Sequence, residues 1–172
     1  AGIEQSRFAL ILTTDADTTA GINWLQTVCA FYETTNAKMI VAPVLYDSGF
    51  HFFSMLQSLE IAGLALVTGA ATAAGKPLMA NGANLAYEKK VFYETKGFEN
   101  DPYTSGDDLL LLQRVYQLYP GGIYFLKSRA ATVFTGAQKT ISGFFNQRKR
   151  WASKYRAFRL PFLKTAAFLV FF

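Results

Sequence analysis

A short apolar run that ends in two closely spaced aspartates limits most strongly what this chain can fold into. Residues 8–13 are Phe-Ala-Leu-Ile-Leu-Thr, a continuous run typical of a central strand that is covered on both faces. Asp15 and Asp17 follow almost at once. Open α/β sheets bind ligands where the strands end and the loops diverge, so we expect both carboxylates to face one cavity there.

Strand and helix patterns alternate along the rest of the chain. We expect further strands at 38–46, at 79–87 with a turn at Asn81-Gly82, and at 123–126 and 131–135 as a hairpin. We expect helices at 20–32 (capped by Thr18 or Thr19), 50–67, 107–118 and 140–159, one or two helical turns at 89–95, and loops at 68–76 and 100–106. This alternation predicts a mixed α/β domain built in layers.

Charge is distributed very unevenly within the overall balance of +5. All twelve acidic residues lie at or before Asp108, and residues 109–172 carry eleven Lys and Arg and no acid. A C-terminal part of this kind is expected to face phosphates or an anionic lipid surface. We do not expect a nucleic acid partner, because no aromatic RNA-binding motif, zinc pattern or helix-turn-helix signature accompanies the basic residues.

The residues that most often bind transition metals are scarce. The single cysteine, Cys29, allows no internal disulfide and lies in an apolar stretch, which is typical of a buried thiol in a reducing compartment. The single histidine, His51, has no cysteine or second histidine near it. We therefore expect His51 to be a surface or packed histidine rather than a metal ligand.

The Asp15-Ala-Asp17 pattern suits a divalent cation. In extended geometry residues i and i+2 project to the same side, and two carboxylates there repel each other unless a cation lies near them. Hard oxygen ligands favour Mg²⁺ or Mn²⁺, and such an ion could also bind a diphosphate. The simpler alternative is an aspartate that caps a helix.

Two further groups of residues could carry chemistry. Asp107 and Asp108 open an expected helix, where acids either benefit from the helix dipole or supply a general base. Gln147, Arg150 and Trp151 stand at i, i+3 and i+4 and share one helix face, which offers groups suited to a pyrophosphate and a sugar. Arg148 and Lys149 are assigned to the basic outer side of that helix.

In this order, the motifs resemble those of family 2 inverting glycosyltransferases. The motifs are Asp-x-Asp after a strand, Gly-Ala-Asn-Leu at 82–85, the acidic pair at 107–108 and Gln-x-x-Arg-Trp at 147–151. Their order and spacing are similar to the membrane-embedded branch that includes cellulose, chitin and hyaluronan synthases and ceramide glucosyltransferase. The resemblance covers nearly the whole chain and implies a GT-A-like mixed sheet with flanking helices.

The resemblance implies a donor site. Asp17 would be the principal ligand of Mg²⁺ or Mn²⁺, with Asp15 beside it and close to the donor diphosphate. Gln147, Arg150 and Trp151 would hold the pyrophosphate of a nucleotide-diphosphate sugar, with a UDP-sugar as the expected donor.

The resemblance also implies a catalytic base and an acceptor site. Asp108 would be the general base that deprotonates the acceptor hydroxyl, and Asp107 stands where the family often has Glu. Gly82 and Asn84 would lie beneath the acceptor, which Trp151 borders. Transfer to a polysaccharide or lipid-linked hydroxyl would then be a single in-line displacement with inversion.

One part of the family pattern has no counterpart in this sequence. Nothing matches the upstream strand and loop whose Asp binds the uracil and ribose of the donor. We therefore expect residues 1–159 to form a partial catalytic domain without its N-terminal strands, inactive in isolation. Residues 160–172 are expected to begin a hydrophobic transmembrane segment, with the catalytic part at the cytoplasmic membrane face.

Two other functions remain as alternatives. Asp15-Ala-Asp17-Thr-Thr19 is also the Asp-x-Asp-x-Thr motif of haloacid-dehalogenase-like phosphatases, but their later Asp is replaced by Leu111 or Leu112. A membrane-surface or lipid-binding module is the other alternative, because the helix at 140–159 mixes basic and aromatic residues.

Overall fold

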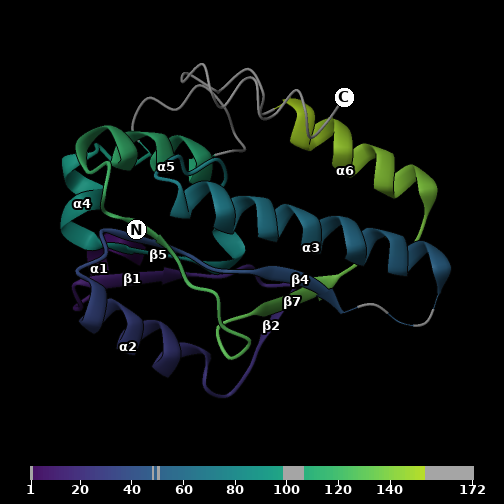
Figure 1. Ribbon diagram of the computed structural model, residues 1–172, viewed down its shortest axis with the longest axis horizontal. Helices are drawn as coiled ribbons and strands as arrows, with labels where there is room; N and C mark the ends of the chain where they lie inside the picture. Colours follow the sequence, from purple (N-terminus) through teal and green to yellow (C-terminus); the bar gives the residue numbers. More distant parts are fainter. Residues whose placement is uncertain (1, 48, 50, 99–106, 154–172) are drawn as a thin grey trace.

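Two small sheets lie end to end at the centre of the protein, and helices cover both faces, as the computed structural model shows (Figure 1). The structure describes residues 2–47, 49, 51–98 and 107–153. The predicted mixed α/β layered fold is confirmed. The predicted end of the last helix at 154–159 and the predicted hydrophobic segment at 160–172 lie outside the described residues.

The first sheet has four strands in the order β1 (Leu10–Thr13), β5 (Leu85–Glu88), β3 (Met39–Val41) and β6 (Ile123–Phe125). The strand β5 pairs antiparallel with both β1 and β3, whereas β3 and β6 run parallel. The second sheet has the order β2 (Thr18–Ala20), β7 (Val133–Gly136) and β4 (Val44–Asp47), with β7 antiparallel to β2 and parallel to β4.

The chain crosses from the first sheet to the second at three places, and two of them correct the sequence predictions. The expected strand 38–46 is interrupted at Ala42-Pro43, because Pro43 has no N–H to continue the ladder, and its two halves belong to different sheets. The expected hairpin is also wrong, since β6 pairs with β3 and β7 pairs with β4. Leu126 N donates to Val41 O at 2.9 Å, and Val133 N donates to Pro43 O at 3.1 Å. The connection from β6 to β7 is therefore hydrogen-bonded alongside the connection from β3 to β4.

In the described part of the chain, four longer helices and three short helical segments surround the sheets. They are α1 (Gly2–Gln5), α2 (Trp24–Thr35), α3 (Phe52–Ala73), η1 (Gly82–Asn84), α4 (Lys89–Glu94), α5 (Asp107–Leu118) and α6 (Ile141–Ser153). The predicted cap at Thr18 or Thr19 is wrong, because residues 18–20 form β2 and α2 begins only at Trp24. The helix α2 ends at Asn36, which takes the left-handed conformation with φ of 52°.

The helix α3 continues through most of the segment predicted as a loop. Its last turns are rich in alanine, the best helix former. The hydroxyls of its threonines donate to backbone carbonyls four residues earlier in the same helix. Thr68 Oγ1 donates to Leu64 O at 2.8 Å, and Thr72 Oγ1 donates to Thr68 O at 2.7 Å. Both threonines are therefore satisfied while buried against the sheet.

Alternation along the central strands divides the core between the two faces of the first sheet. On β3, Met39 and Val41 pack against Leu109 and Leu112 of α5 in one apolar cluster. Ile40, which lies between them, packs in a second cluster on the α2 side. Figure 1 shows α2 on one side of the sheets and α3 and α5 on the other. The strand ends are thereby fixed between two helical layers.

The helix α3 also carries an exposed apolar side. Among the described residues it is the one helix long and apolar enough to cross a membrane by length and composition, with a mean hydropathy of 1.4. Only 17 % of that window is buried. Phe52, Leu59 and Leu66 lie on its outward side, each more than half exposed.

Candidate active site

A cleft of about 600 Å³ is lined by residues from both sheets and from α6. It brings together eight of the nine predicted site residues, which come from four separate parts of the chain. They are Asp15, Asp17, Gly82, Asp107, Asp108, Gln147, Arg150 and, at its rim with the neighbouring pocket, Trp151; the one absent from its lining is Asn84. The sequence motifs therefore converge in space.

Asp15 and Asp17 lie in the turn that carries the chain from β1 to β2. Thr18 holds this turn, because its backbone N–H and its hydroxyl both donate to Asp15 O, at 3.2 and 2.7 Å. Both aspartates are exposed and line the cleft. The turn joins two strands, and so the pattern does not cap a helix here.

Asp108 lies at the start of α5 and reaches across to η1. Its Oδ2 accepts a hydrogen bond from Gly82 N at 3.1 Å, and its Oδ1 accepts one from Leu109 N at 2.8 Å. Asp107 Oδ1 accepts from Asp108 N at 3.1 Å. These backbone donors fix the orientation of the Asp108 carboxylate at the edge of the cleft.

Asn84 has a different position from the other predicted residues. It is 2 % exposed, and its amide is fully used inside the framework. Its Oδ1 accepts from Trp24 Nε1 at 3.0 Å, and its Nδ2 donates at 2.8 Å to the carbonyls of Pro43 and Ala131. Asn84 therefore ties α2 to the β3–β4 and β6–β7 crossovers and turns no side-chain group toward the cleft.

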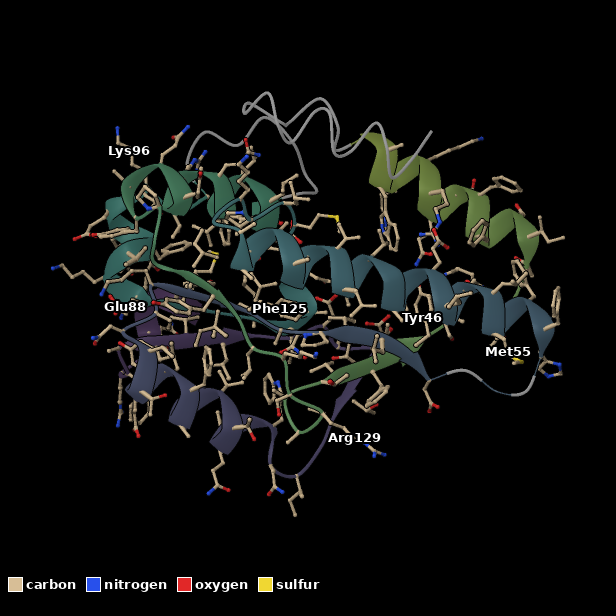
Figure 2. All side chains as sticks on the ribbon, viewed as in Figure 1. Tyr46, Met55, Glu88, Lys96, Phe125 and Arg129 are labelled. Carbon is tan, nitrogen blue, oxygen red and sulfur yellow. The ribbon has the colours of Figure 1, made fainter. Side chains whose placement is uncertain are left out.

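Gln147, Arg150 and Trp151 share the face of α6 that lines the cleft, as their spacing predicts. Tyr46 on β4 (Figure 2) contacts this face, with its hydroxyl donating to Gln147 Oε1 at 3.3 Å. Burial raises the pKa of Tyr46. Tyr46 was not expected from the sequence, where it is one more aromatic residue at the end of an apolar strand.

Arg148 corrects the expectation that it lies on the outer side of α6. Its side chain is only 16 % exposed and forms an ion pair with Glu60 of α3. Its guanidinium lies over the rings of Phe144 and Trp151, at 4.5 and 4.2 Å from their centroids. Because Phe144 is one turn before Arg148 and Trp151 one turn after, the residue holds the indole in place and joins α6 to α3.

Two further residues were missed by sequence reasoning. The buried Gln57 of α3 makes paired hydrogen bonds with the backbone of Gln138, each 3.0 Å long, which hold the segment before α6. Tyr87 lines the cleft from β5, and burial raises its pKa to about 12. Its hydroxyl has no hydrogen-bond partner among the described residues. No motif in the sequence marks either residue.

The two aspartates of the turn are the residues that could hold a metal. Among the described residues no group of three or more His, Cys, Asp or Glu is arranged to bind one. A pair of exposed carboxylates at a cleft fits Mg²⁺ or Mn²⁺ held together with substrate phosphates and water, because Mg²⁺ uses one or two carboxylates in such sites.

The layered α/β fold with this acidic and basic cleft is that of a GT-A-like glycosyltransferase domain. The chain belongs to the glycosyl transferase family group 2, whose family model matches residues 10–170. A comparison with curated proteins finds no match. Membership in this family favours the predicted glycosyl transfer over the phosphatase alternative, and it implies a nucleotide-sugar donor and an acceptor.

Proposed function

We propose that the protein transfers a sugar from a nucleotide-diphosphate donor to a hydroxyl acceptor, with inversion, as a member of the membrane-associated Gln-x-x-Arg-Trp branch. The observation that carries the proposal is the single cleft that Asp17, Asp108 and Arg150 all line. A metal-binding turn, a base and a cationic helix face are the three parts that a direct displacement at a diphosphate-activated sugar requires.

The donor diphosphate lies between the turn at Asp15-Ala-Asp17 and α6. The two carboxylates would hold Mg²⁺ or Mn²⁺, and the ion would supply positive charge to stabilise the departing diphosphate. Arg150 pairs with phosphate oxygens from the other side, and Gln147, held by Tyr46, donates its amide N–H. A UDP-sugar is the donor we propose, as in the family members that this sequence resembles.

Asp108 is the general base. Its carboxylate takes the proton of the acceptor hydroxyl while the acceptor oxygen forms its bond to the anomeric carbon and the bond to the diphosphate breaks. The attack comes from the face opposite the leaving group, and so the configuration inverts without a covalent enzyme intermediate. Gly82 N–H orients this carboxylate, and Asp107 supports the start of α5.

Trp151 and the loop at Gly82 border the acceptor. The indole ring offers an apolar face at the mouth of the cleft, and Arg148 fixes its orientation. We propose that Asn84 is a positioning residue, because it fastens the loop at 82–84 from below without reaching the cleft.

We also propose that the protein works at the cytoplasmic face of a membrane. Two features support this. Exposed apolar residues line the outer side of α3, and α6 combines Arg and Lys with exposed Ile141 and Phe145. The same features favour the membrane-surface module as a second function, which the transferase proposal does not exclude.

A donor panel tests the proposal. The full-length protein in membranes is incubated with Mn²⁺ and a series of nucleotide sugars labelled in the sugar, and the labelled product and the anomeric configuration are measured. We expect one or a few donors to give an inverted product. Absence of transfer from every donor, or a retained configuration, contradicts the proposal.

A further inference from the structure

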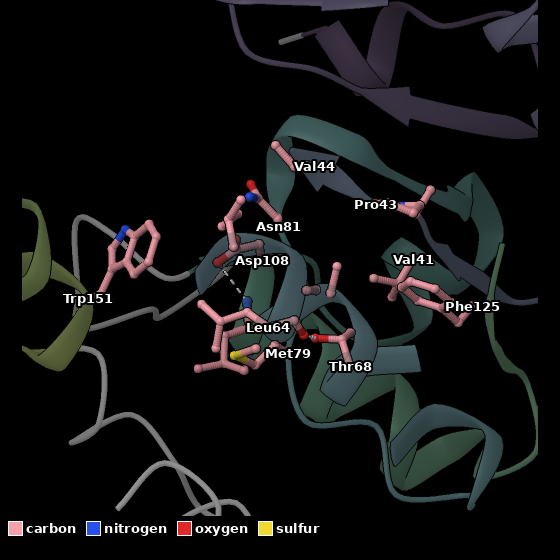
Figure 3. Close-up of a pocket in the computed structure, with 15 residues that line it drawn as sticks. Val41, Pro43, Val44, Leu64, Thr68, Met79, Asn81, Asp108, Phe125 and Trp151 are labelled. Carbon is pink, nitrogen blue, oxygen red and sulfur yellow. Dashed lines mark hydrogen bonds between the residues drawn. The ribbon is translucent and has the colours of Figure 1, made fainter. Parts of the chain in front are cut away.

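A second, apolar pocket of about 170 Å³ lies beside the cleft, between α3 and the crossover from β3 to β4 (Figure 3). Most of its lining side chains are apolar, and the polar ones other than Thr68 lie at its mouth. Its inner walls are formed by Val41, Ala42, Pro43, Leu64, Ala65, Thr68, Met79, Ala80, Leu109 and Phe125. Such a cavity matches the engineered apolar cavity of about 150 Å³ that binds a benzene ring, which has six carbons.

The pocket opens at the catalytic base. Asn81, Asp108 and Trp151 line both this pocket and the cleft, and so do Val44 and Ile61. Figure 3 shows Trp151 on α6 on one side of Asp108, with the apolar wall at Val41 and Phe125 on the other. A molecule with a hydroxyl at Asp108 can therefore extend directly into the pocket.

The pocket offers little to a sugar ring. The one polar side chain of its inner wall is Thr68, whose hydroxyl already donates to Leu64 O at 2.8 Å. At the mouth, Asn81 Oδ1 accepts from Ala83 N at 3.0 Å. A carbohydrate placed here would lose the hydrogen bonds that its hydroxyls make with water, whereas an alkyl chain would lose none.

A larger cavity of about 1050 Å³ continues beyond the first. The two share Pro43, Ala65 and Phe125, and the Phe125 ring lies between them. Gly69 on α3 makes room for this ring, because a Cβ built there would lie 2.9 Å from two of its carbons. The two cavities are therefore neighbours that share one aromatic wall.

We infer that the acceptor is a lipid alcohol, whose hydroxyl lies at Asp108 and whose apolar tail occupies the pocket between α3 and the β3–β4 crossover. This inference rests on the proposed glycosyltransferase function and narrows its acceptor from carbohydrate or lipid to lipid. The exposed apolar side of α3 is consistent with a tail that arrives from a membrane.

The test is a chain-length series. With the donor found in the panel, the full-length protein in detergent is assayed with straight-chain alcohols from butanol to dodecanol and with cellotetraose. We expect kcat/KM to rise about threefold to fourfold for each added methylene until the pocket is full, and cellotetraose to be the poorer acceptor. A flat series, or a preference for cellotetraose, overturns the inference.

Three variants localise the effect. Ala65→Phe fills the pocket and is expected to abolish the dependence on chain length. Val67→Phe, on the same helix but lining neither the cleft nor the two cavities described above, is expected to preserve it. Leu64→Ala enlarges the pocket, so the rise should extend to longer alcohols. Unchanged series in both Ala65→Phe and Leu64→Ala overturn the inference.

Donor binding and donor hydrolysis by water separate the two proposals. In Ala65→Phe, the donor Kd and the rate of donor hydrolysis should stay within about twofold of those of the parent protein, which is the full-length protein without substitutions. If the parent protein binds and hydrolyses no nucleotide sugar, the proposed function fails and the inference fails with it. If donor hydrolysis proceeds and only the chain-length dependence is absent, the inference alone is wrong. Because the series is measured on the parent protein and Leu64→Ala as well, the inference stays testable even if Ala65→Phe fails to fold.

Discussion

Asp108 Oδ2 accepts a hydrogen bond from the backbone N–H of Gly82, 26 positions earlier in the chain, at 3.1 Å. This bond joins the first turn of α5 to η1, the short helical segment that precedes β5. Two motifs that are separate in the sequence therefore form one unit, in which a loop backbone orients a carboxylate at the edge of the cleft.

We predict that Asp108→Asn lowers kcat by about 10²- to 10⁴-fold, the range for loss of a general base. The amide oxygen of Asn can accept from Gly82 N or from Leu109 N but not from both, so the thermal midpoint should fall slightly. Asp47→Asn removes an exposed acid that lines neither the cleft nor the apolar pocket, and it serves as the matched control. Transfer rates that are equal in the two variants would remove Asp108 from the mechanism.

A second prediction concerns Arg148, which we expect to position Trp151. Loss of a stacked guanidinium is worth roughly threefold to thirtyfold, so Arg148→Ala should raise the acceptor KM by that factor and shift the tryptophan fluorescence. Lys149→Ala removes an exposed neighbouring charge and should do neither. An unchanged acceptor KM in Arg148→Ala would show that the indole does not need this support.

Asn84 is predicted to be important for stability. Replacing it with Ala leaves Trp24 Nε1 and the carbonyls of Pro43 and Ala131 without their partner, at a cost of about 2–4 kcal/mol in the free energy of unfolding. Urea denaturation measures this cost. Asn23→Ala is the control, because Asn23 makes no side-chain capping bond; a similar small loss in both variants would contradict the assignment.

The raised pKa of Tyr87 makes stability fall at alkaline pH. Its pKa is about 12 in the folded protein against 10 for an ordinary tyrosine, so both states are protonated below pH 10 and the group has no effect there. As pH rises from 10 to 12 the unfolded state ionises first, and up to about 2–3 kcal/mol of stability is lost. Tyr87→Phe should remove this part of the loss, as measured by urea denaturation across that range. An identical decline in parent and variant would contradict the assigned cause.

We predict that activity depends on a divalent cation through the turn at Asp15 and Asp17. Chelation with EDTA should abolish transfer, and added Mn²⁺ should restore it. Asp17→Asn should raise the Mn²⁺ concentration for half-maximal rate by more than about tenfold, because a ligating carboxylate matters at least as much as a residue that supports one. Glu33→Gln, an exposed acid on α2, is the control; equal Mn²⁺ requirements in the two variants would exclude Asp17 as a ligand.

Local patterns in the sequence predicted much of the candidate site. The apolar run at 8–13 leads into the turn at Asp15-Ala-Asp17, the acidic pair opens α5, and Gln147, Arg150 and Trp151 share a helix face. These features depend only on residues that are close in the sequence. Their periodicity can therefore be recognised from the sequence alone.

Long-range pairing could not be read in the same way. The segment 38–46 is apolar after Lys38, yet it divides at Pro43 because β3 pairs with β5 and β6 whereas β4 pairs with β7. The segment 68–73 reads as a loop, yet it is helical because the sheet buries Thr68 and Thr72. Arg148 looks solvent-facing until Glu60 and Trp151 are placed beside it.

The sequence by itself determined the chemistry of this protein: two carboxylates suited to a metal, an acidic pair at a helix start and a cationic aromatic helix face, together with the family that shares them. Only the tertiary structure decided how these groups meet, that Asn84 serves the framework, and that an apolar pocket opens beside Asp108. The physical reason is that residue type and local period fix side-chain chemistry and helix or strand preference. The partners of a buried amide and the shape of a cavity depend instead on packing between segments far apart in the chain.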